Sequence, residues 1–195
     1  MPGVYRPHVV RGLALAVAVA LIVAASADAA RTRVIHYTPY RADGAVRSGL
    51  RIVPDSGSCW TTSEIIGHAY RCFTGNFIRD PCFENEFESN NVLCVGSPWN
   101  HAAVRIHLTK SLPNVDFYVS SIPWAIQLFN GHRCVFLQGA AGVAHGYRTN
   151  YACGRSTNSP VLYGSPRRGR IWRIREARGY QGAGMHLVSI KTVWR

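Results

Sequence analysis

Six cysteines are the side chains of this sequence with the widest choice of chemistry. Thiols can pair as disulfides, bind a metal ion or act as nucleophiles. An even number of cysteines in a chain exported to an oxidising compartment favours disulfides. We therefore predict three disulfides, which many different pairings could provide. The cysteines are Cys59, Cys72, Cys82, Cys94, Cys134 and Cys153.

A weak internal echo favours one of these pairings. Residues 70–72 read Tyr-Arg-Cys and residues 151–153 read Tyr-Ala-Cys, and each run follows another cysteine at a loop-sized distance. The echo suggests a duplication of residues 55–100 and 124–195. The pairs that it favours are Cys59 with Cys72, Cys134 with Cys153, and Cys82 with Cys94.

A cluster of arginines near the C-terminus offers a second chemistry, the binding of anions. If residues 171–175 form a strand with Trp172 and Ile174 inward, Arg173 and Arg175 share its outward face. Guanidinium groups bind phosphate and carboxylate through paired hydrogen bonds. The cluster therefore predicts a face that binds an anionic polymer of the cell envelope or an acidic protein partner. Its members, opposed only by Glu176, are Arg167, Arg168, Arg170, Arg173, Arg175 and Arg178.

Metal binding has weaker support from the sequence. No two histidines have the tight spacing of a zinc site, so neither a metal site nor a cofactor is predicted. Four carboxylates gather at Asp80, Glu84, Glu86 and Glu88, without the spacing or the turn glycine of a calcium-binding loop. We interpret them as a solvated loop that offsets arginine charges.

The N-terminus has the pattern of an export signal. Residues 1–11 are basic, residues 13–25 are continuously apolar, and residues 27–29 read Ala-Asp-Ala, as a signal peptidase requires. The apolar run is shorter than the about 20 residues that span a bilayer. We expect residues 1–30 to be removed, which leaves a secreted, extracellular protein with no membrane span.

The charge of the chain is strongly positive. The formal net charge is +12, and it falls to +11 when Arg6, Arg11 and Asp28 leave with the signal. Such a charge favours contact with anionic polymers, although it also provides solubility. Specific nucleic-acid binding is not expected. The sequence also lacks a P-loop, a dinucleotide fingerprint and a Gly-x-Ser-x-Gly elbow.

The elements that must position these residues are mainly strands. Apolar and polar residues alternate over residues 103–109, which is the period of a half-buried strand. Asn130-Gly131, between two apolar runs, predicts a hairpin with a two-residue turn and positive φ at both positions. Further strands are expected at residues 50–53, 147–153, 171–175 and 187–193.

These patterns predict a mainly β fold, as a small disulfide-stapled sandwich or partly open barrel with at most one or two short helices. Residues 59–72 are expected to hold a short helix or a bent strand. Residues 31–49 are polar and rich in arginine, so we predict a flexible basic lead-in. Residues 50–195 are expected to form a single β-rich domain.

Short motifs extend over residues 55–165. They include Gly57-Ser58-Cys59-Trp60, Ala69-Tyr70-Arg71-Cys72, Asp80-Pro81-Cys82-Phe83, Val92-Leu93-Cys94, Ser97-Pro98-Trp99, Pro123-Trp124-Ala125 and Tyr151-Ala152-Cys153. This set resembles a group of secreted actinobacterial proteins of unknown function. The resemblance implies a shared disulfide-bearing extracellular domain, and it implies no activity.

The first of these motifs admits an enzymatic alternative. Residues 57–60, Gly-Ser-Cys-Trp, are similar to the nucleophile signature of papain-like cysteine peptidases, and His186 lies at about the spacing of their general base. The match fails at Ser56 and Val53, and no asparagine follows His186 to orient its ring.

We therefore expect a non-enzymatic binding module whose arginine face meets an anionic partner. One alternative is a hydrolase that uses Cys59 and His186. Another is a secreted inhibitor or toxin that makes its contacts through the hairpin tip at Asn130-Gly131. A free thiol would favour the hydrolase over the disulfide-stapled module.

Overall fold

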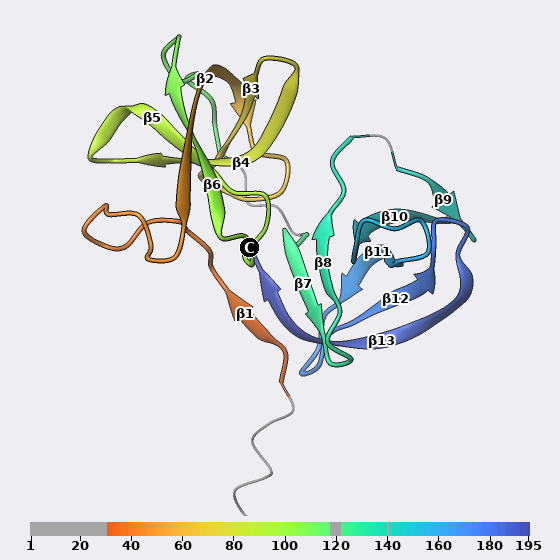
Figure 1. The fold of residues 1–195 in the computed structure, drawn as a ribbon. Helices are drawn as coiled ribbons and strands as arrows, with labels where there is room; N and C mark the ends of the chain where they lie inside the picture. Colours follow the sequence, from red (N-terminus) through yellow and green to blue (C-terminus); the bar gives the residue numbers. More distant parts are fainter. Residues whose placement is uncertain (1–30, 118–121, 140) are drawn as a thin grey trace, which may run out of the picture. The chain divides into compact units, whose positions relative to one another are not determined.

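The computed structural model describes residues 31–117, 122–139 and 141–195 (Figure 1). The predicted signal peptide, residues 1–30, lies outside the described residues. Residues Thr32–Arg195 form one compact unit. The part of the chain that the structure describes has no helix long and apolar enough to cross a membrane.

Every regular element among the described residues is a strand, which confirms the mainly β fold class. Residues 59–72, expected to hold a short helix or a bent strand, contain strands: strands occupy both ends of the range and a turn joins them. The strands are β1 (Arg33–Ile35), β2 (Arg51–Thr62), β3 (Tyr70–Thr74), β4 (Phe77–Asn85), β5 (Glu88–Cys94), β6 (Ala102–Leu108), β7 (Ala125–Leu128), β8 (Arg133–Phe136), β9 (Val143–Ala144), β10 (Tyr147–Ala152), β11 (Pro160–Arg167), β12 (Arg173–Arg178) and β13 (Ala183–Trp194).

Strands β2 to β6 form a closed five-stranded barrel. Consecutive strands pair antiparallel, and the parallel pairing of β2 with β6 closes the barrel. The alternation predicted for residues 103–109 is confirmed in β6, where Ile106 is fully buried and His107 is exposed. The apolar face of β6 therefore lines the barrel interior, as the period of two requires.

Two disulfides occupy the interior of this barrel. Cys59 and Cys72 are direct partners on β2 and β3, and Cys82 and Cys94 are direct partners on β4 and β5. The four cysteines belong to one buried cluster with Ile106 and its neighbours. The Sγ atoms of Cys72, Cys82 and Cys94 all lie within 4.8 Å of one another. The two crosslinks thus pack against each other where larger apolar side chains fill most small barrels.

The remaining strands form a second sheet that also returns on itself. Its order is β1-β13-β12-β11-β10-β8-β7, and β13 pairs in addition with β7. Strands β7, β8, β10, β11, β12 and β13 therefore make a ring of antiparallel neighbours, which lies at the right of Figure 1. One buried cluster receives side chains from all of them: Ile126, Leu128, Cys134, Tyr151, Leu162, Ile174, Ile190 and Val193.

The third disulfide joins Cys134 of β8 to Cys153, directly after β10. It lies beside the pairing of Val135 with Ala152, so it links neighbouring strands like the other two. The three disulfides are those that the sequence echo favours. The disulfides do not test the duplication itself, which stays a prediction. The two halves close differently: the barrel closes by a parallel pair of strands and the ring by an antiparallel pair.

The segment 31–49 differs from the flexible lead-in that its composition predicts. Within it, β1 pairs in parallel with the last residues of β13. The buried Thr32 hydroxyl donates to the Ile190 carbonyl oxygen at 2.6 Å and accepts from the Trp172 N–H at 2.7 Å. Its polar composition hides this order, because backbone pairing and a buried hydroxyl leave no hydrophobic period in the sequence.

The structure also corrects the predicted two-residue turn at Asn130-Gly131. Only Gly131 has a positive φ there, of 92°. The Gly131 N–H donates to the Leu128 carbonyl at 3.1 Å, and the Leu128 N–H donates to the His132 carbonyl at 2.9 Å. The hairpin between β7 and β8 thus has a three-residue loop with glycine in the left-handed position.

Removal of the Cys82–Cys94 crosslink tests how far the barrel depends on its disulfides. The double variant Cys82→Ala, Cys94→Ala should lower the free energy of unfolding by about 2–4 kcal/mol, because the unfolded chain regains the freedom of the opened loop. Urea unfolding followed by tryptophan fluorescence measures the loss, with reduced wild-type protein for comparison. An unchanged unfolding midpoint in both samples would contradict this role.

Candidate anion-binding site

The six predicted arginines lie on one hairpin, which we call the arginine hairpin: strands β11 and β12 with the connection 168–172. Arg167 ends β11, Arg168 and Arg170 lie in the connection, and the rest lie on β12. All are exposed except Arg175, which is partly buried. The structure therefore brings the whole predicted set onto one supersecondary unit.

Two of these arginines face each other across the strands. Arg167 and Arg173 are direct Cα partners, so their side chains leave the same face of the sheet. Like charges directly opposite destabilise a strand pair. Within the described residues, neither guanidinium forms an ion pair with a carboxylate. An anion bound between them would relieve this repulsion.

Arg175 shares that face, two residues beyond Arg173, and an aromatic ring holds it in place. Its guanidinium carbon lies 3.7 Å from the centre of the Tyr147 ring. In the connection, the guanidinium of Arg168 lies over Trp172 at 5.2 Å. Stacking on a ring orients a guanidinium and leaves its N–H edge available for an acceptor. Tyr147 was not predicted from the sequence, because it lies on β10, which is separated from β12 by β11, and no local pattern aligns these strands.

The one carboxylate in the hairpin does not neutralise this face. Glu176 points to the other side of β12, together with the buried Ile174, and only 5% of its surface is exposed. Its oxygens accept from Asn130 Nδ2 at 3.2 Å and from His132 Nδ1 at 2.6 Å. The positive charge of the arginine hairpin is therefore not offset by the acid beside it in sequence.

Not all six arginines converge on one point. Arg178 pairs with Pro160 at the far end of β12, beyond a register shift at Glu176. Arg170 lies in the connection, where its carbonyl oxygen accepts from the Thr32 N–H at 3.0 Å. The candidate site is therefore centred on Arg167, Arg173 and Arg175, with the other three arginines at its edges.

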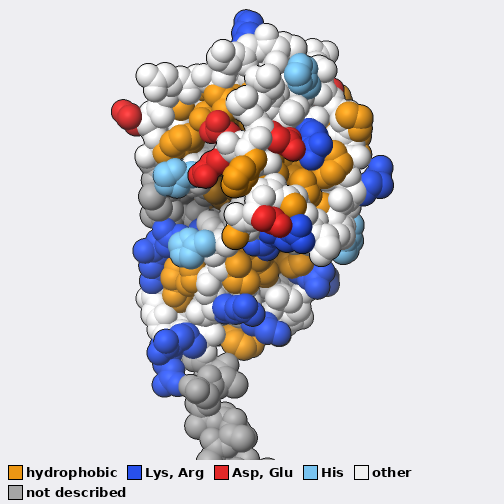
Figure 2. Space-filling view, turned by 90° about the vertical axis from the view of Figure 1, so that its left-hand side faces the viewer, with side chains coloured by type: hydrophobic (Ala, Val, Ile, Leu, Met, Phe, Trp, Pro, Cys, Tyr) orange, Lys and Arg blue, Asp and Glu red, His pale blue; other side chains and the backbone are white. Residues whose placement is uncertain are grey.

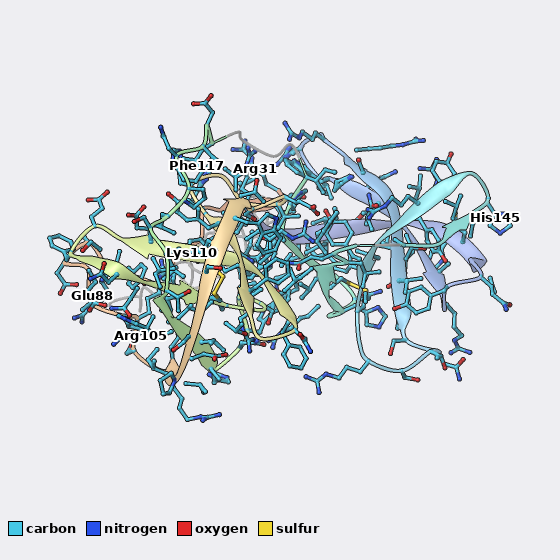
Figure 3. All side chains as sticks on the ribbon, turned by 90° about the horizontal axis from the view of Figure 1, so that it is seen from above. Arg31, Glu88, Arg105, Lys110, Phe117 and His145 are labelled. Atoms are coloured by element: carbon cyan, nitrogen blue, oxygen red, sulfur yellow. A yellow bond between two sulfur atoms is a disulfide. The ribbon has the colours of Figure 1, made fainter. Side chains whose placement is uncertain are left out.

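A cavity of about 590 Å³ lies beside Arg175. Its other lining residues include His145, His186 and the glycine-rich stretch 182–184. A Cβ atom on Gly182 would lie 2.9 Å from the Ala144 Cβ, so a glycine is needed for the two loops to touch. His145 projects from the turn between β9 and β10, far from barrel residues such as Glu88 and Arg105 (Figure 3). The cavity could admit a phosphate or carboxylate group to Arg175.

Charges are also segregated on the surface. On the face shown in Figure 2, Asp and Glu side chains gather in the upper part, whereas Lys and Arg side chains predominate in the lower part. A polyanion would therefore meet less repulsion over the lower part of this face.

The structure leaves the Cys59 and His186 pair without a nucleophile. The Cys59 sulfur is bonded to Cys72, and no cysteine among the described residues is free. A sulfur in a disulfide cannot form the thiolate that attacks a carbonyl. His186 instead lies on β13, where its Nδ1 contacts the Gly184 carbonyl at 2.9 Å. The hairpin tip at Asn130-Gly131, predicted as an inhibitor contact, is anchored to Glu176 by Asn130.

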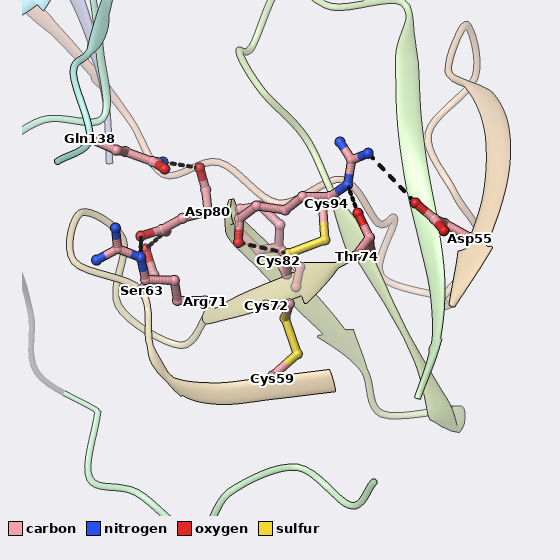
Figure 4. The surroundings of a disulfide bond; sticks show 12 residues. Asp55, Cys59, Ser63, Arg71, Cys72, Thr74, Asp80, Cys82, Cys94 and Gln138 are labelled. Atoms are coloured by element: carbon pink, nitrogen blue, oxygen red, sulfur yellow. Dashed lines mark hydrogen bonds and ion pairs between the residues drawn. A yellow bond between two sulfur atoms is a disulfide. The ribbon is translucent and has the colours of Figure 1, made fainter. Parts of the chain in front are cut away.

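The four carboxylates predicted as an acidic loop differ in their burial. Glu84 and Glu86 are exposed and Glu88 is partly buried, but the Asp80 side chain is fully enclosed. Ser63 O–H and the Glu64 N–H donate to its two oxygens, the second at 3.2 Å, and Arg71 Nε lies 3.9 Å away (Figure 4). Burial raises the pKa of Asp80 to about 6, against the opposing effects of the Ser63 hydrogen bond and the Arg71 charge.

Comparison of the chain with protein-family models, with curated proteins and with solved structures finds no match. The resemblance to secreted actinobacterial proteins therefore stays a prediction. The candidate site rests on the chain's own residues.

The raised pKa of Asp80 predicts how stability changes with pH. Because the folded-state pKa exceeds the ordinary value near 4, this carboxyl group stabilises the fold most below pH 4, and the contribution is lost as pH rises through 6. Relative to Asp80→Asn, wild type should lose roughly 2–3 kcal/mol of unfolding free energy between pH 4 and pH 7.

Denaturant unfolding at several pH values measures this difference. Asp43→Asn, at an exposed carboxylate that forms an ion pair with Arg41, is the matched control and should leave the pH dependence unchanged. Parallel curves for wild type and Asp80→Asn across this range would contradict the assignment.

Proposed function

We propose that the protein is a secreted, non-enzymatic binding module whose arginine hairpin binds an anionic polymer of the cell envelope. The observation that carries the proposal is the direct opposition of Arg167 and Arg173 with no carboxylate partner among the described residues. A face that collects like charges is costly unless a ligand of opposite charge occupies it.

The preorganisation of Arg175 supports the same function. Tyr147 fixes its guanidinium beside Arg173, and the adjacent cavity provides access. A ligand then loses less free energy to the ordering of these side chains. Repeated phosphate or carboxylate groups of a polymer fit a row of arginines better than a single small anion does, because each group can meet its own guanidinium.

An extracellular location after secretion fits the remaining observations. The N-terminal pattern of basic, apolar and small residues is typical of an exported chain. The three disulfides persist in oxidising compartments and are rare in the cytosol. Anionic polymers of the cell envelope lie in that same environment.

Charge reversal in the arginine hairpin tests the proposal, with heparin as a model polyanion. Binding constants are measured at several salt concentrations for wild type, Arg168→Glu, Arg173→Glu and Arg175→Glu. Each variant should bind about tenfold more weakly at 0.1 M salt. The plot of log binding constant against log salt should become shallower by about 1 for each lost contact.

Lys110→Glu is the matched control, because it makes the same change of charge at an exposed residue beyond the five-stranded barrel. It should retain nearly wild-type binding. Binding that is independent of salt, or that falls equally in Lys110→Glu, would refute a site on the arginine hairpin. Binding of an acidic protein but not of heparin would replace the polymer by a protein partner.

A further inference from the structure

A second cluster of chemistry-bearing side chains lies on the opposite face of β12 from the arginine site. It comprises His132 before β8, Glu176 on β12 and His186 on β13. Glu176 and His186 are direct strand partners, so they share one face of the sheet. This face continues inward to Ile174, which belongs to the buried cluster of the six-stranded ring. The cluster therefore lies at an end of the ring interior.

The carboxylate of Glu176 is placed between two imidazoles. Its Oε1 lies 2.6 Å from His132 Nδ1, and its Oε2 lies 3.8 Å from His186 Nε2. Only 7% of the Glu176 side chain is exposed, against 41% for His132 and 62% for His186. A buried carboxylate with one imidazole at each oxygen is a donor set that zinc and neighbouring transition metals bind.

Hydrogen bonds outside the cluster orient two of its three members. The Asn130 amide donates to Glu176 Oε2 at 3.2 Å. The His186 Nδ1 lies 2.9 Å from the Gly184 carbonyl oxygen, which can only accept, so Nδ1 carries the hydrogen. The Nε2 of a neutral His186 is then left with its lone pair toward Glu176. Metal-binding histidines commonly donate their second nitrogen to a backbone carbonyl in this way.

We propose that His132, Glu176 and His186 form a binding site for a divalent transition-metal ion such as Zn²⁺. Metal–ligand bonds of about 2.1 Å place neighbouring donor atoms of a tetrahedral site about 3.4 Å apart. The donor atoms of the three residues do not all lie within 4.8 Å of one another, so His132 and His186 must both turn toward one point beside Glu176 to hold a single ion. Both rings are exposed enough to make these movements.

Binding replaces a hydrogen bond by a coordinate bond at His132. A neutral His132 that donates its Nδ1 hydrogen to Glu176 must change tautomer to bind: solvent takes the Nδ1 proton, Nε2 gains a proton, and the Nδ1 lone pair of the still neutral ring then binds the metal. His186 binds through Nε2 without loss of its Nδ1 hydrogen. Three protein ligands leave a position open for water or an anion. His186 also lines the cavity beside Arg175.

The test measures binding of Zn²⁺ alone to tag-free protein by equilibrium dialysis at pH 7.5, where ordinary imidazoles are neutral. Wild type should bind one equivalent. His132→Ala and His186→Ala should each weaken binding by at least tenfold, because each removes one of three ligands. Zn²⁺ should also raise the unfolding temperature of wild type and leave that of His186→Ala unchanged.

His107→Ala is the matched control, since it removes an exposed imidazole from the outward face of β6. It should bind Zn²⁺ as wild type does. Both histidine variants replace exposed side chains and should fold, so the result does not depend on replacement of the buried Glu176. The proposal is overturned by absence of a one-equivalent site, by unchanged binding in either variant, or by an equal loss in His107→Ala.

Discussion

Two stacked crosslinks in the interior of the five-stranded barrel are the constraint on which the rest of the structure depends. Five short strands enclose too little apolar volume to offset the conformational entropy of their own ordering. Here cystine sulfur replaces much of that core, and each bond joins residues that are already direct partners on adjacent strands. The crosslinks therefore fix strand register as well as proximity.

The fixed strand register also positions residues outside the barrel. Cys82 lies two residues after Asp80, whose carboxylate meets Ser63 and the Glu64 N–H, and whose carbonyl oxygen accepts from Gln138 beyond β8 (Figure 4). Another buried cluster combines barrel residues such as Phe83 and Leu93 with Trp124, next to β7. The barrel and the six-stranded ring are thus packed together by a shared apolar cluster and by hydrogen bonds anchored next to a disulfide.

Much of the fold was predictable because it depends on local patterns. Alternation over residues 103–109 identified β6, and the echo of Tyr-x-Cys favoured the three disulfides that the structure contains. Features that depend on long-range pairing were not predictable. Within segment 31–49, residues Arg33–Ile35 pair with β13, which lies at the other end of the chain. Asn130-Gly131 has a wider loop than its dipeptide suggests, with Asn130 bound to Glu176.

The candidate sites were likewise predictable only where they depend on local sequence. The arginines were visible as a cluster in the sequence, but the opposition of Arg167 to Arg173 depends on the register of β11 with β12. The orientation of Glu176 away from the arginines required the packing of Ile174. His132 and Glu176 are 44 residues apart in sequence, so no spacing rule could have joined them.

The role of β13 in closing the ring sets the order in which an emerging chain can fold. The barrel uses only residues 51–108, so all its strands are present before the ring begins. The ring needs β13, whose final residues pair with β7 on one edge and with β1 on the other. Until those residues emerge, strands β7 to β12 have open edges, which bind other chains readily. Premature termination near residue 190 would leave a closed barrel joined to an aggregation-prone sheet.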